Sequence, residues 1–234
     1  MRKGGLLLAL FLSFFATLSA QEHPEMTLEA DVVSQYVWRG MHLGGVSLQP
    51  TVGIGYQGLS FSAWGTTGLA DSLDPMELDL TLSYTTGGLT LALTDYWSTT
   101  KGDDAKYFCY QAHRTKHVFE ATAGYDFGLL SLTWNLNFAG DDYQTSNGHR
   151  SYSSFVELTA PFRLADCDWE ASAGFVPYAS DLYGTTGFGV THLSLRATHD
   201  IPITSQFTLP IFGEIAANPY DSKAWLVFGL TLRP

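Results

Sequence analysis

Charged residues are scarce in this sequence. Asp, Glu, Lys and Arg make up 15% of its 234 residues, whereas an ordinary soluble domain has roughly 25%. Basic residues are the scarcer kind, because 12 Lys and Arg stand against 23 Asp and Glu, a formal net charge of −11. Positive charge is what binds a phosphate backbone, so this balance disfavours a nucleic-acid partner.

Long hydrophobic runs are also missing. The longest one, Leu6–Leu18, falls short of the roughly 20 residues that span a bilayer as a helix. It follows Arg2 and Lys3, an arrangement typical of a secretory signal peptide. We therefore expect residues 1–20 to be a signal peptide and residues 21–234 to form the exported domain.

A helical period is absent, and a period of two takes its place. In "MELDLTLSYTTGGLTLALTDYW", residues 76–97, apolar residues fill every second position up to Tyr84, and the alternation resumes at Leu89. Successive side chains of a strand point to opposite faces, so this pattern predicts strands with one apolar and one polar side.

About twelve segments of this kind predict an all-β chain. Short turns alternate with longer loops between them, which is typical of a transmembrane antiparallel up-and-down barrel with periplasmic turns and extracellular loops. Aromatic residues near both ends of the segments, such as Tyr36, Trp38 and Trp225 at the loop ends, fit two interfacial belts. The expected strands are residues 28–38, 46–56, 59–67, 76–85, 89–97, 118–126, 129–139, 152–162, 169–178, 190–199, 206–216 and 224–232.

A secreted β-sandwich is the competing architecture, since its sheets also carry one apolar face. The lysines disfavour it. After the signal peptide they are Lys101, Lys106, Lys116 and Lys223, all in or beside expected loops, whereas a soluble sandwich places Lys on strand faces and edges.

Several stretches resemble one family over about Val33 to Leu232. They are "DVVSQYVWRGMHLGG", "LQPTVGIGYQGLSFSAWGTTG", "ELDLTLSY", "HVFEATAGYDFG", "SYSSFVELTAPF" and a late "NP" at Asn218 and Pro219. Together they are similar to the TorF-type porins of Gram-negative outer membranes. The resemblance implies an outer-membrane barrel. One departure is the end at Arg233-Pro234, where such barrels usually carry an aromatic residue that the assembly machinery recognises.

Alternation assigns ten charged residues to the lumen. Twelve strands are intermediate between a filled eight-stranded barrel and a wide sixteen-stranded channel. Two functions stay open. The first is a narrow diffusion channel that favours cations, and we prefer this function because inward acids outnumber inward bases. The second is a closed barrel that is plugged by salt bridges and acts through its surface. The lumen residues are Glu29, Asp31, Arg39, Glu77, Asp79, Glu120, Glu157, Glu170, Arg196 and Glu214.

Candidate catalytic residues are few. His192 and Ser194 have the H-x-S spacing of outer-membrane lipid hydrolases, a nucleophile beside a base. Because Leu193 and Leu195 claim the lipid face, we expect both side chains to line the lumen, away from acyl substrates. The sequence therefore predicts no enzyme and no cofactor, with a lipid hydrolase as the weakest alternative.

A metal site is also weighed in the longest loop. Cys109, His113 and His117 form C-x3-H-x3-H, but a fourth ligand of clear spacing is lacking, so we expect an irregular loop. The pairs Asp103-Asp104 and Asp141-Asp142 are expected at solvated loop tips. Cys109 and Cys167 fall at opposite ends of the barrel, too far apart for a disulfide.

The partners follow from the location. We expect outer-membrane lipids and lipopolysaccharide around the wall, the barrel-assembly machinery during insertion, and small solutes or ions in the lumen.

Overall fold

The computed structural model describes residues 23–70, 74–100 and 103–233. The expected signal peptide lies outside these residues. In the described part of the chain all regular structure is β, and no helix is long and apolar enough to cross a membrane.

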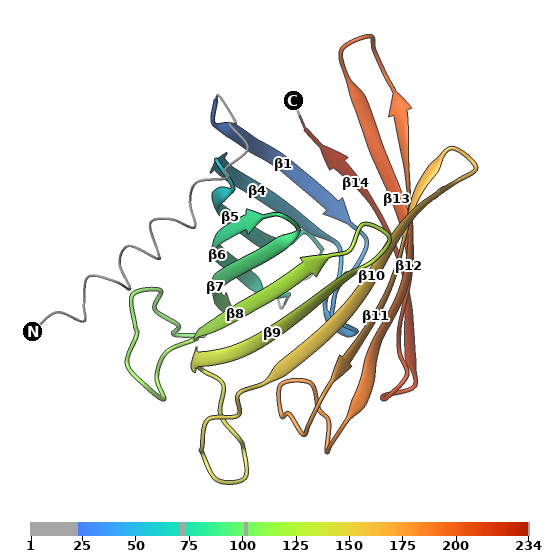
Figure 1. Cartoon of the computed structure of the whole chain (residues 1–234). Helices are drawn as coiled ribbons and strands as arrows, with labels where there is room; N and C mark the ends of the chain where they lie inside the picture. Colours follow the sequence, from blue (N-terminus) through green and yellow to red (C-terminus); the bar gives the residue numbers. More distant parts are fainter. Residues whose placement is uncertain (1–22, 71–73, 101–102, 234) are drawn as a thin grey trace, which may run out of the picture.

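The described residues form fourteen strands, and twelve of them make one closed antiparallel barrel (Figure 1). The predicted all-β up-and-down barrel is thus confirmed. Neighbours in sequence pair with each other around the wall, and β1 closes it by pairing with both β14 and β4. The strands are β1 (Glu25–Val33), β2 (Tyr36–Trp38), β3 (Met41–Gly44), β4 (Ser47–Tyr56), β5 (Leu59–Gly68), β6 (Met76–Thr86), β7 (Leu89–Thr99), β8 (His117–Asp126), β9 (Ser131–Gly140), β10 (Ser154–Leu164), β11 (Cys167–Val176), β12 (Gly189–Pro202), β13 (Thr208–Asn218) and β14 (Lys223–Leu232).

The two faces of the wall differ as the alternation requires. On β7 the side chains of Leu91 and Leu93 are 49% and 53% exposed, whereas Thr94 is 8% exposed. Apolar side chains therefore cover the outside and polar ones the inside. In an ordinary soluble protein the apolar side chains are instead buried inside, and the charged ones lie mostly on the surface.

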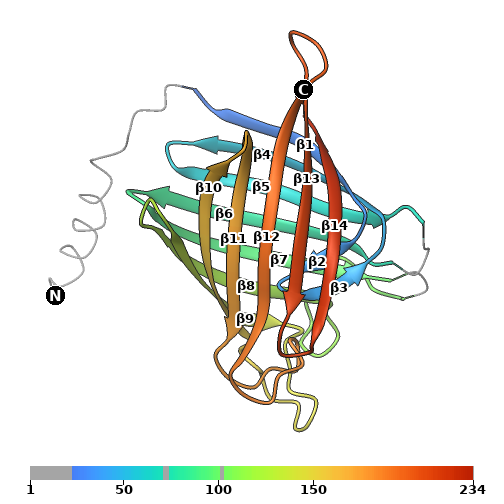
Figure 2. The same cartoon turned by 90° about the vertical axis from the view of Figure 1, so that its right-hand side faces the viewer.

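The connections separate the two ends of the barrel. At one end the strands are joined by tight turns, such as Gln57-Gly58 and Gly87-Gly88, where both residues have positive φ. Such two-residue turns match the right-handed twist of paired strands. The chain's C-terminus lies at this turn end, and the longer loops gather at the other, loop end (Figures 1 and 2).

One predicted strand, residues 28–38, is wrong in its second half. The wall strand β1 ends at Val33, and Ser34 exchanges two hydrogen bonds with Phe228 of β14 just beyond it. The chain then forms the separate β2–β3 hairpin, which lies inside the loop half of the barrel (Figure 2). Since β1 pairs directly with β4, the wall closes without this hairpin.

The buried apolar core lies inside the barrel, around the hairpin. Val37 packs against Val33, Phe212 and Val227, while Trp38 and Met41 pack against a second cluster. The second cluster is Phe155, Val176 and Tyr183. The expected interfacial positions of Tyr36 and Trp38 are therefore wrong, because both side chains lie inside with the hairpin.

Candidate functional site

The hairpin tip is pressed against the inner wall. Arg39 and Gly40 form its turn, both with positive φ. A Cβ on Gly40 would lie 1.8 Å from the Thr191 carbonyl oxygen, so a side chain does not fit there. Asn218 donates a hydrogen bond of 3.0 Å to the Gly40 carbonyl. The tip is therefore held against β12 and β13.

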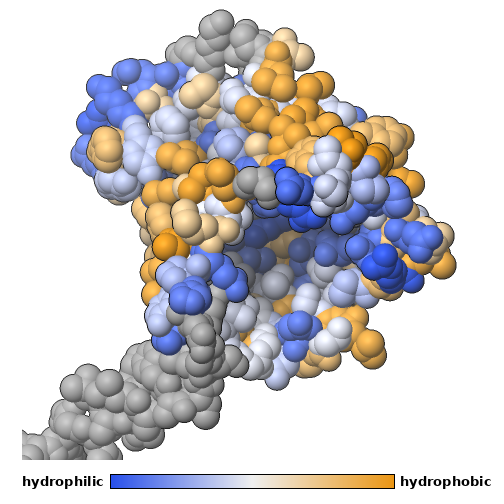
Figure 3. All heavy atoms as spheres, turned by 90° about the horizontal axis from the view of Figure 1, so that it is seen from above, coloured by the Kyte–Doolittle hydropathy of each residue, from blue (hydrophilic) through white to orange (hydrophobic). Residues whose placement is uncertain are grey.

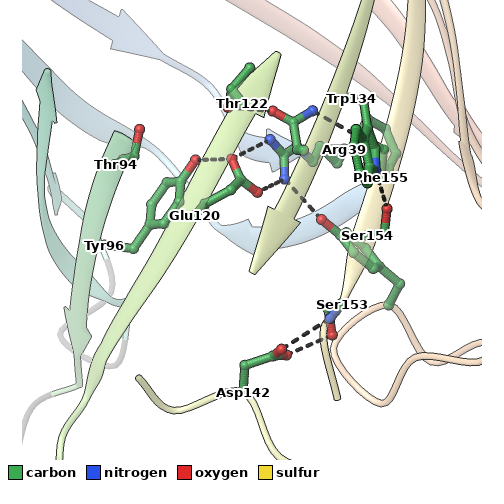
Figure 4. Close-up of polar contacts among 12 residues, drawn as sticks. Arg39, Thr94, Tyr96, Glu120, Thr122, Trp134, Asp142, Ser153, Ser154 and Phe155 are labelled. Atoms are coloured by element: carbon green, nitrogen blue, oxygen red, sulfur yellow. Dashed lines mark hydrogen bonds and ion pairs between the residues drawn. The ribbon is translucent and has the colours of Figure 1, made fainter. Parts of the chain in front are cut away.

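Arg39 is the centre of a buried polar cluster (Figure 4). Its two terminal nitrogens lie 2.6 and 2.9 Å from the two carboxylate oxygens of Glu120 on β8. It also donates to the Tyr183 hydroxyl at 2.9 Å, and Tyr96 donates to Glu120 at 2.9 Å. The Glu120 side chain is 2% exposed. A two-point contact of this kind fixes the orientation of both groups.

Aromatic rings complete the surroundings of Arg39. Its guanidinium carbon lies 4.4 Å from the centre of the Trp38 ring and 5.0 Å from that of Phe155. Burial raises the pKa of Tyr183, in the β11–β12 loop, to about 12, although Arg39 acts in the opposite direction. The phenol is therefore neutral at physiological pH and accepts the hydrogen bond from Arg39.

A second acidic group lies on β6. Glu77 accepts a hydrogen bond of 3.1 Å from the Tyr36 hydroxyl. Asp79, two residues on along the same face, has one buried carboxylate oxygen without a hydrogen-bond partner. None of the described Lys or Arg side chains lies within ion-pair distance of either carboxylate.

The turn half of the lumen is polar and open (Figure 3). Arg196 lies 3.8 Å from Glu214 and 3.6 Å from the centre of the Phe212 ring. Asp31 on β1 accepts a hydrogen bond of 2.6 Å from Thr231. Glu29 on β1 lies on the inner face of its strand, because its neighbour Leu28 is exposed on the outer face. Glu170 on β11 is also on the inner face, where it pairs across the strands with Arg196 of β12.

The H-x-S residues lie on the inner face of β12. Leu193 and Leu195 are exposed on the outside, while His192 is buried. The His192 Nε2 atom lies 3.7 Å from a carboxylate oxygen of Glu157, and its Nδ1 atom has no partner. Ser194 pairs across the strands with Ser172. Neither side chain faces the outer wall, where acyl chains would approach.

The three residues weighed as metal ligands are not brought together. His113 stacks on Tyr143 at 4.2 Å, and the Cys109 thiol points to the Arg114 carbonyl. His117 is fully buried instead, with its Nδ1 atom 2.7 Å from Asp95. Across the described ranges no three His, Cys, Asp or Glu residues form a group that could hold a metal.

The Asp95–His117 contact was not anticipated. Asp95 shares the outer face of β7 with exposed Leu91 and Leu93, and Tyr107 and Tyr110 of the β7–β8 loop cover His117. The sequence carried one signal for this contact: Asp95 is an acid in a row of otherwise apolar outward positions. Its position on β7 is where the β7–β8 loop folds over the wall.

Asp142 was expected at a solvated loop tip, and this is wrong. It is 4% exposed and accepts two hydrogen bonds from Ser153, at 2.6 Å from the hydroxyl and 3.0 Å from the backbone (Figure 4). The carboxylate thus fixes the loop between β9 and β10.

Cys109 and Cys167 are both free, one in the β7–β8 loop and the other at the turn end of β11.

Two cavities flank the hairpin. One, of about 600 Å³, is lined by polar groups such as His42, Asp181 and Lys223. It also includes Trp225, which stacks on His42 and so points inward, contrary to its expected place in the outer aromatic belt. The other, of about 440 Å³, lies between the hairpin and strands β6 to β8.

Comparison with solved structures finds distant similarity to membrane proteins, among them two bacterial porins. A chain from a study of in-meso crystallization of membrane proteins is 9% identical, with a TM-score of 0.43 over 91% of this chain and 83% of that one. A Rhodopseudomonas blastica porin triple mutant is 9% identical, with a TM-score of 0.33 over 90% and 99%. A BenF-like porin from Pseudomonas fluorescens Pf-5 is 9% identical, with a TM-score of 0.30 over 86% and 57%.

Sequence comparison adds no family. No family model matches the chain, and no curated protein matches it significantly. The resemblance to TorF-type porins therefore stays a prediction.

Proposed function

We propose that this protein spans the outer membrane and works as a narrow diffusion channel that favours cations, with its loop half constricted by the β2–β3 hairpin. The observation that carries the proposal is a barrel whose outer surface is apolar and whose lumen is acidic. Lipid and lipopolysaccharide would surround the wall, and the barrel-assembly machinery would insert it.

The outer wall supports a membrane location. Side chains such as Leu93, Ile54 and Ile215 are at least half exposed, and a wall covered with them would be costly in water. In hydrocarbon the same wall is favourable, because a closed barrel leaves no unpaired strand edge.

The charges inside support cation preference. Arg39 pairs with Glu120 and Arg196 with Glu214, which leaves six of the eight lumen acids without a described Lys or Arg within 4.0 Å. Fixed negative charge beside a low-dielectric wall attracts cations and repels anions.

Recording from planar bilayers tests the proposal. Purified protein should give discrete conductance steps, with reversal potentials in a potassium chloride gradient that favour potassium. The preference should weaken at high salt, because the Debye length falls from about 10 Å at 0.1 M to about 3 Å at 1 M. Anion preference would refute the charge argument, and folded protein without steps would refute the channel.

A closed barrel is the second candidate, and the buried Arg39–Glu120 contact favours it. Together with the apolar clusters around Trp38 and Val37, this contact occupies part of the loop half of the lumen, beside the two cavities. Replacing residues 36–44 by a short Gly-Ser linker separates the two functions. If only the shortened variant conducts, the hairpin is a permanent plug.

A further inference from the structure

The smaller cavity beside the hairpin is mostly apolar and aromatic. The hairpin contributes Trp38, Met41 and Leu43, and the wall contributes Tyr96 and Val118. Its volume of about 440 Å³ falls within the usual range for small-molecule sites, about 300–1,000 Å³. Its chemistry therefore decides what it could hold.

One carboxylate, Glu77, lines this cavity. A single charged group in an apolar pocket sets the orientation and charge of a ligand. Tyr36 already donates to one of its oxygens at 3.1 Å, and this contact holds the side chain in place. The other oxygen is not used by any described hydrogen bond.

The basic residue of the lining is engaged elsewhere. The Lys116 ammonium lies 3.8 Å from Asp103, and its side chain is 44% exposed. Solvent therefore screens it far more than a buried charge. Lys116 does not reach ion-pair distance of Glu77 in the described structure.

Negative charge near the cavity is in excess. Glu120 is neutralised by Arg39, but Glu77 and Asp79 share one face of β6, and Asp79 keeps a buried carboxylate oxygen without a partner. Buried charges in proteins are normally paired, because an unpaired one loses its hydration without compensation. A cation bound in the cavity would supply a counter-charge for Glu77, the carboxylate of its lining.

The aromatic walls provide a surface for the apolar body of such a ligand. One face of the Trp38 ring is already covered by the Arg39 guanidinium, 4.4 Å from the ring centre, so Trp38 contributes apolar contact to the cavity and leaves Glu77 as the group that binds the cation. Trp38 and Tyr96 meet edge to face, with ring centres 5.8 Å apart, and form a corner of the pocket with Met41 and Leu43 nearby.

We propose that this cavity binds an organic ammonium ion with a compact apolar body. The ammonium group donates to the free oxygen of Glu77, and the apolar body packs against Trp38, Met41 and Leu43. The inference requires the barrel and its hairpin but not the passage of solute, so it stands apart from the proposed channel.

Three probes of one shape test the charge requirement. The refolded full-length barrel is titrated by calorimetry with 2-phenylethylammonium, with neutral 2-phenylethanol and with anionic 3-phenylpropionate. The cation should bind at least about tenfold more tightly than the alcohol, since it gains a charge-assisted hydrogen bond. Equal binding of the cation and the alcohol, or no binding of the cation, would overturn the proposal.

Two variants locate the site. Glu77→Gln should remove the preference for the cation, whereas the same change at exposed Glu25 of β1 should leave it unaltered. Leu43→Trp, which fills the cavity and keeps the carboxylate, should weaken the cation and the alcohol alike. Unchanged binding in both cavity variants would place the ligand elsewhere and refute the assignment. A protein that binds the cation but gives no conductance steps would sink the channel and leave this site standing.

Discussion

At the scale of the residue, Arg39 is the most consequential side chain in the lumen. It stands on a two-residue turn and satisfies both oxygens of Glu120. Such a buried pair need not add net stability compared with apolar residues, but each member depends on the other. Its main effect is to specify where the hairpin tip docks.

Removing Arg39 should therefore be costly. Arg39→Gln leaves Glu120 buried without its cation, and we expect the free energy of unfolding to fall by about 3–5 kcal/mol, measured by urea unfolding in lipid. The double variant Arg39→Gln with Glu120→Gln should recover most of this loss, because no unpaired charge remains. A single variant as stable as the native protein would contradict the cluster's role.

The unpaired acids of β6 should control ion selectivity. Glu77→Gln combined with Asp79→Asn removes negative charge from the lumen, so the reversal potential should shift toward zero and show weaker preference for potassium. Arg39→Gln removes positive charge and should maintain or increase that preference. The opposite order of the two variants in the same salt gradient would show that other groups set the selectivity.

At the scale of the element, the β2–β3 hairpin depends on close backbone contact. Gly40 has a φ of +75°, and a Cβ there would lie 1.8 Å from the Thr191 carbonyl. Strand β12 or the hairpin would have to move to accept any side chain. The hairpin is thus fitted to the inner wall rather than loosely inserted.

Gly40→Ala should displace the hairpin tip. We expect a loss of at least about 1 kcal/mol in the free energy of unfolding, since a left-handed conformation and a steric clash both oppose the substitution. Gly187→Ala is the control, because its Cβ would meet no atom within 4 Å. Equal stability of the two variants would mean that the tip does not bear on β12.

Alternation was enough to predict the wall, but not the hairpin. Leu91, Leu93 and Thr94 follow a local rule that each strand obeys by itself. The apolar pattern of β1 resumes at Tyr36 and Trp38, and these two aromatics suited an interface as well as a core. Gly40, between two apolar stretches, was a turn signal that the strand pattern obscured.

The candidate site likewise contains one part that the sequence could predict and one part that it could not. The inward positions of Glu77 and Asp79 follow from the parity of a single strand, whereas the contact between Arg39 and Glu120 joins residues 81 positions apart. No local pattern specifies a pairing of that kind, because the docking angle of the hairpin fixes it.

At the scale of the whole molecule, the two ends of the barrel differ in their connections. Tight turns and the C-terminus lie at one, and long loops gather at the other (Figure 1). Cys109 and Cys167 mark these ends, since one lies in the β7–β8 loop and the other at the first residue of β11. The two thiols therefore lie at opposite ends of the barrel.

Labelling intact cells checks this orientation. A membrane-impermeant maleimide should modify Cys109 and spare Cys167, because the loops of such barrels face outward and the turns face the periplasm. Both should react after the outer membrane is permeabilised. Selective labelling of Cys167 in intact cells would invert the topology.

The closure of β1 on β4 has a consequence for biogenesis. The ladder from Glu25↔Gly55 to Val33↔Ser47 completes the cylinder without residues 34–46, so the wall can seal before the hairpin enters. If the hairpin enters after closure, Arg39 reaches Glu120 from the loop mouth, and its charge passes through a polar opening. The cylinder and the hairpin are thus separate sets of strand pairings, so the hairpin can be lengthened, shortened or exchanged without redesigning the cylinder that holds it.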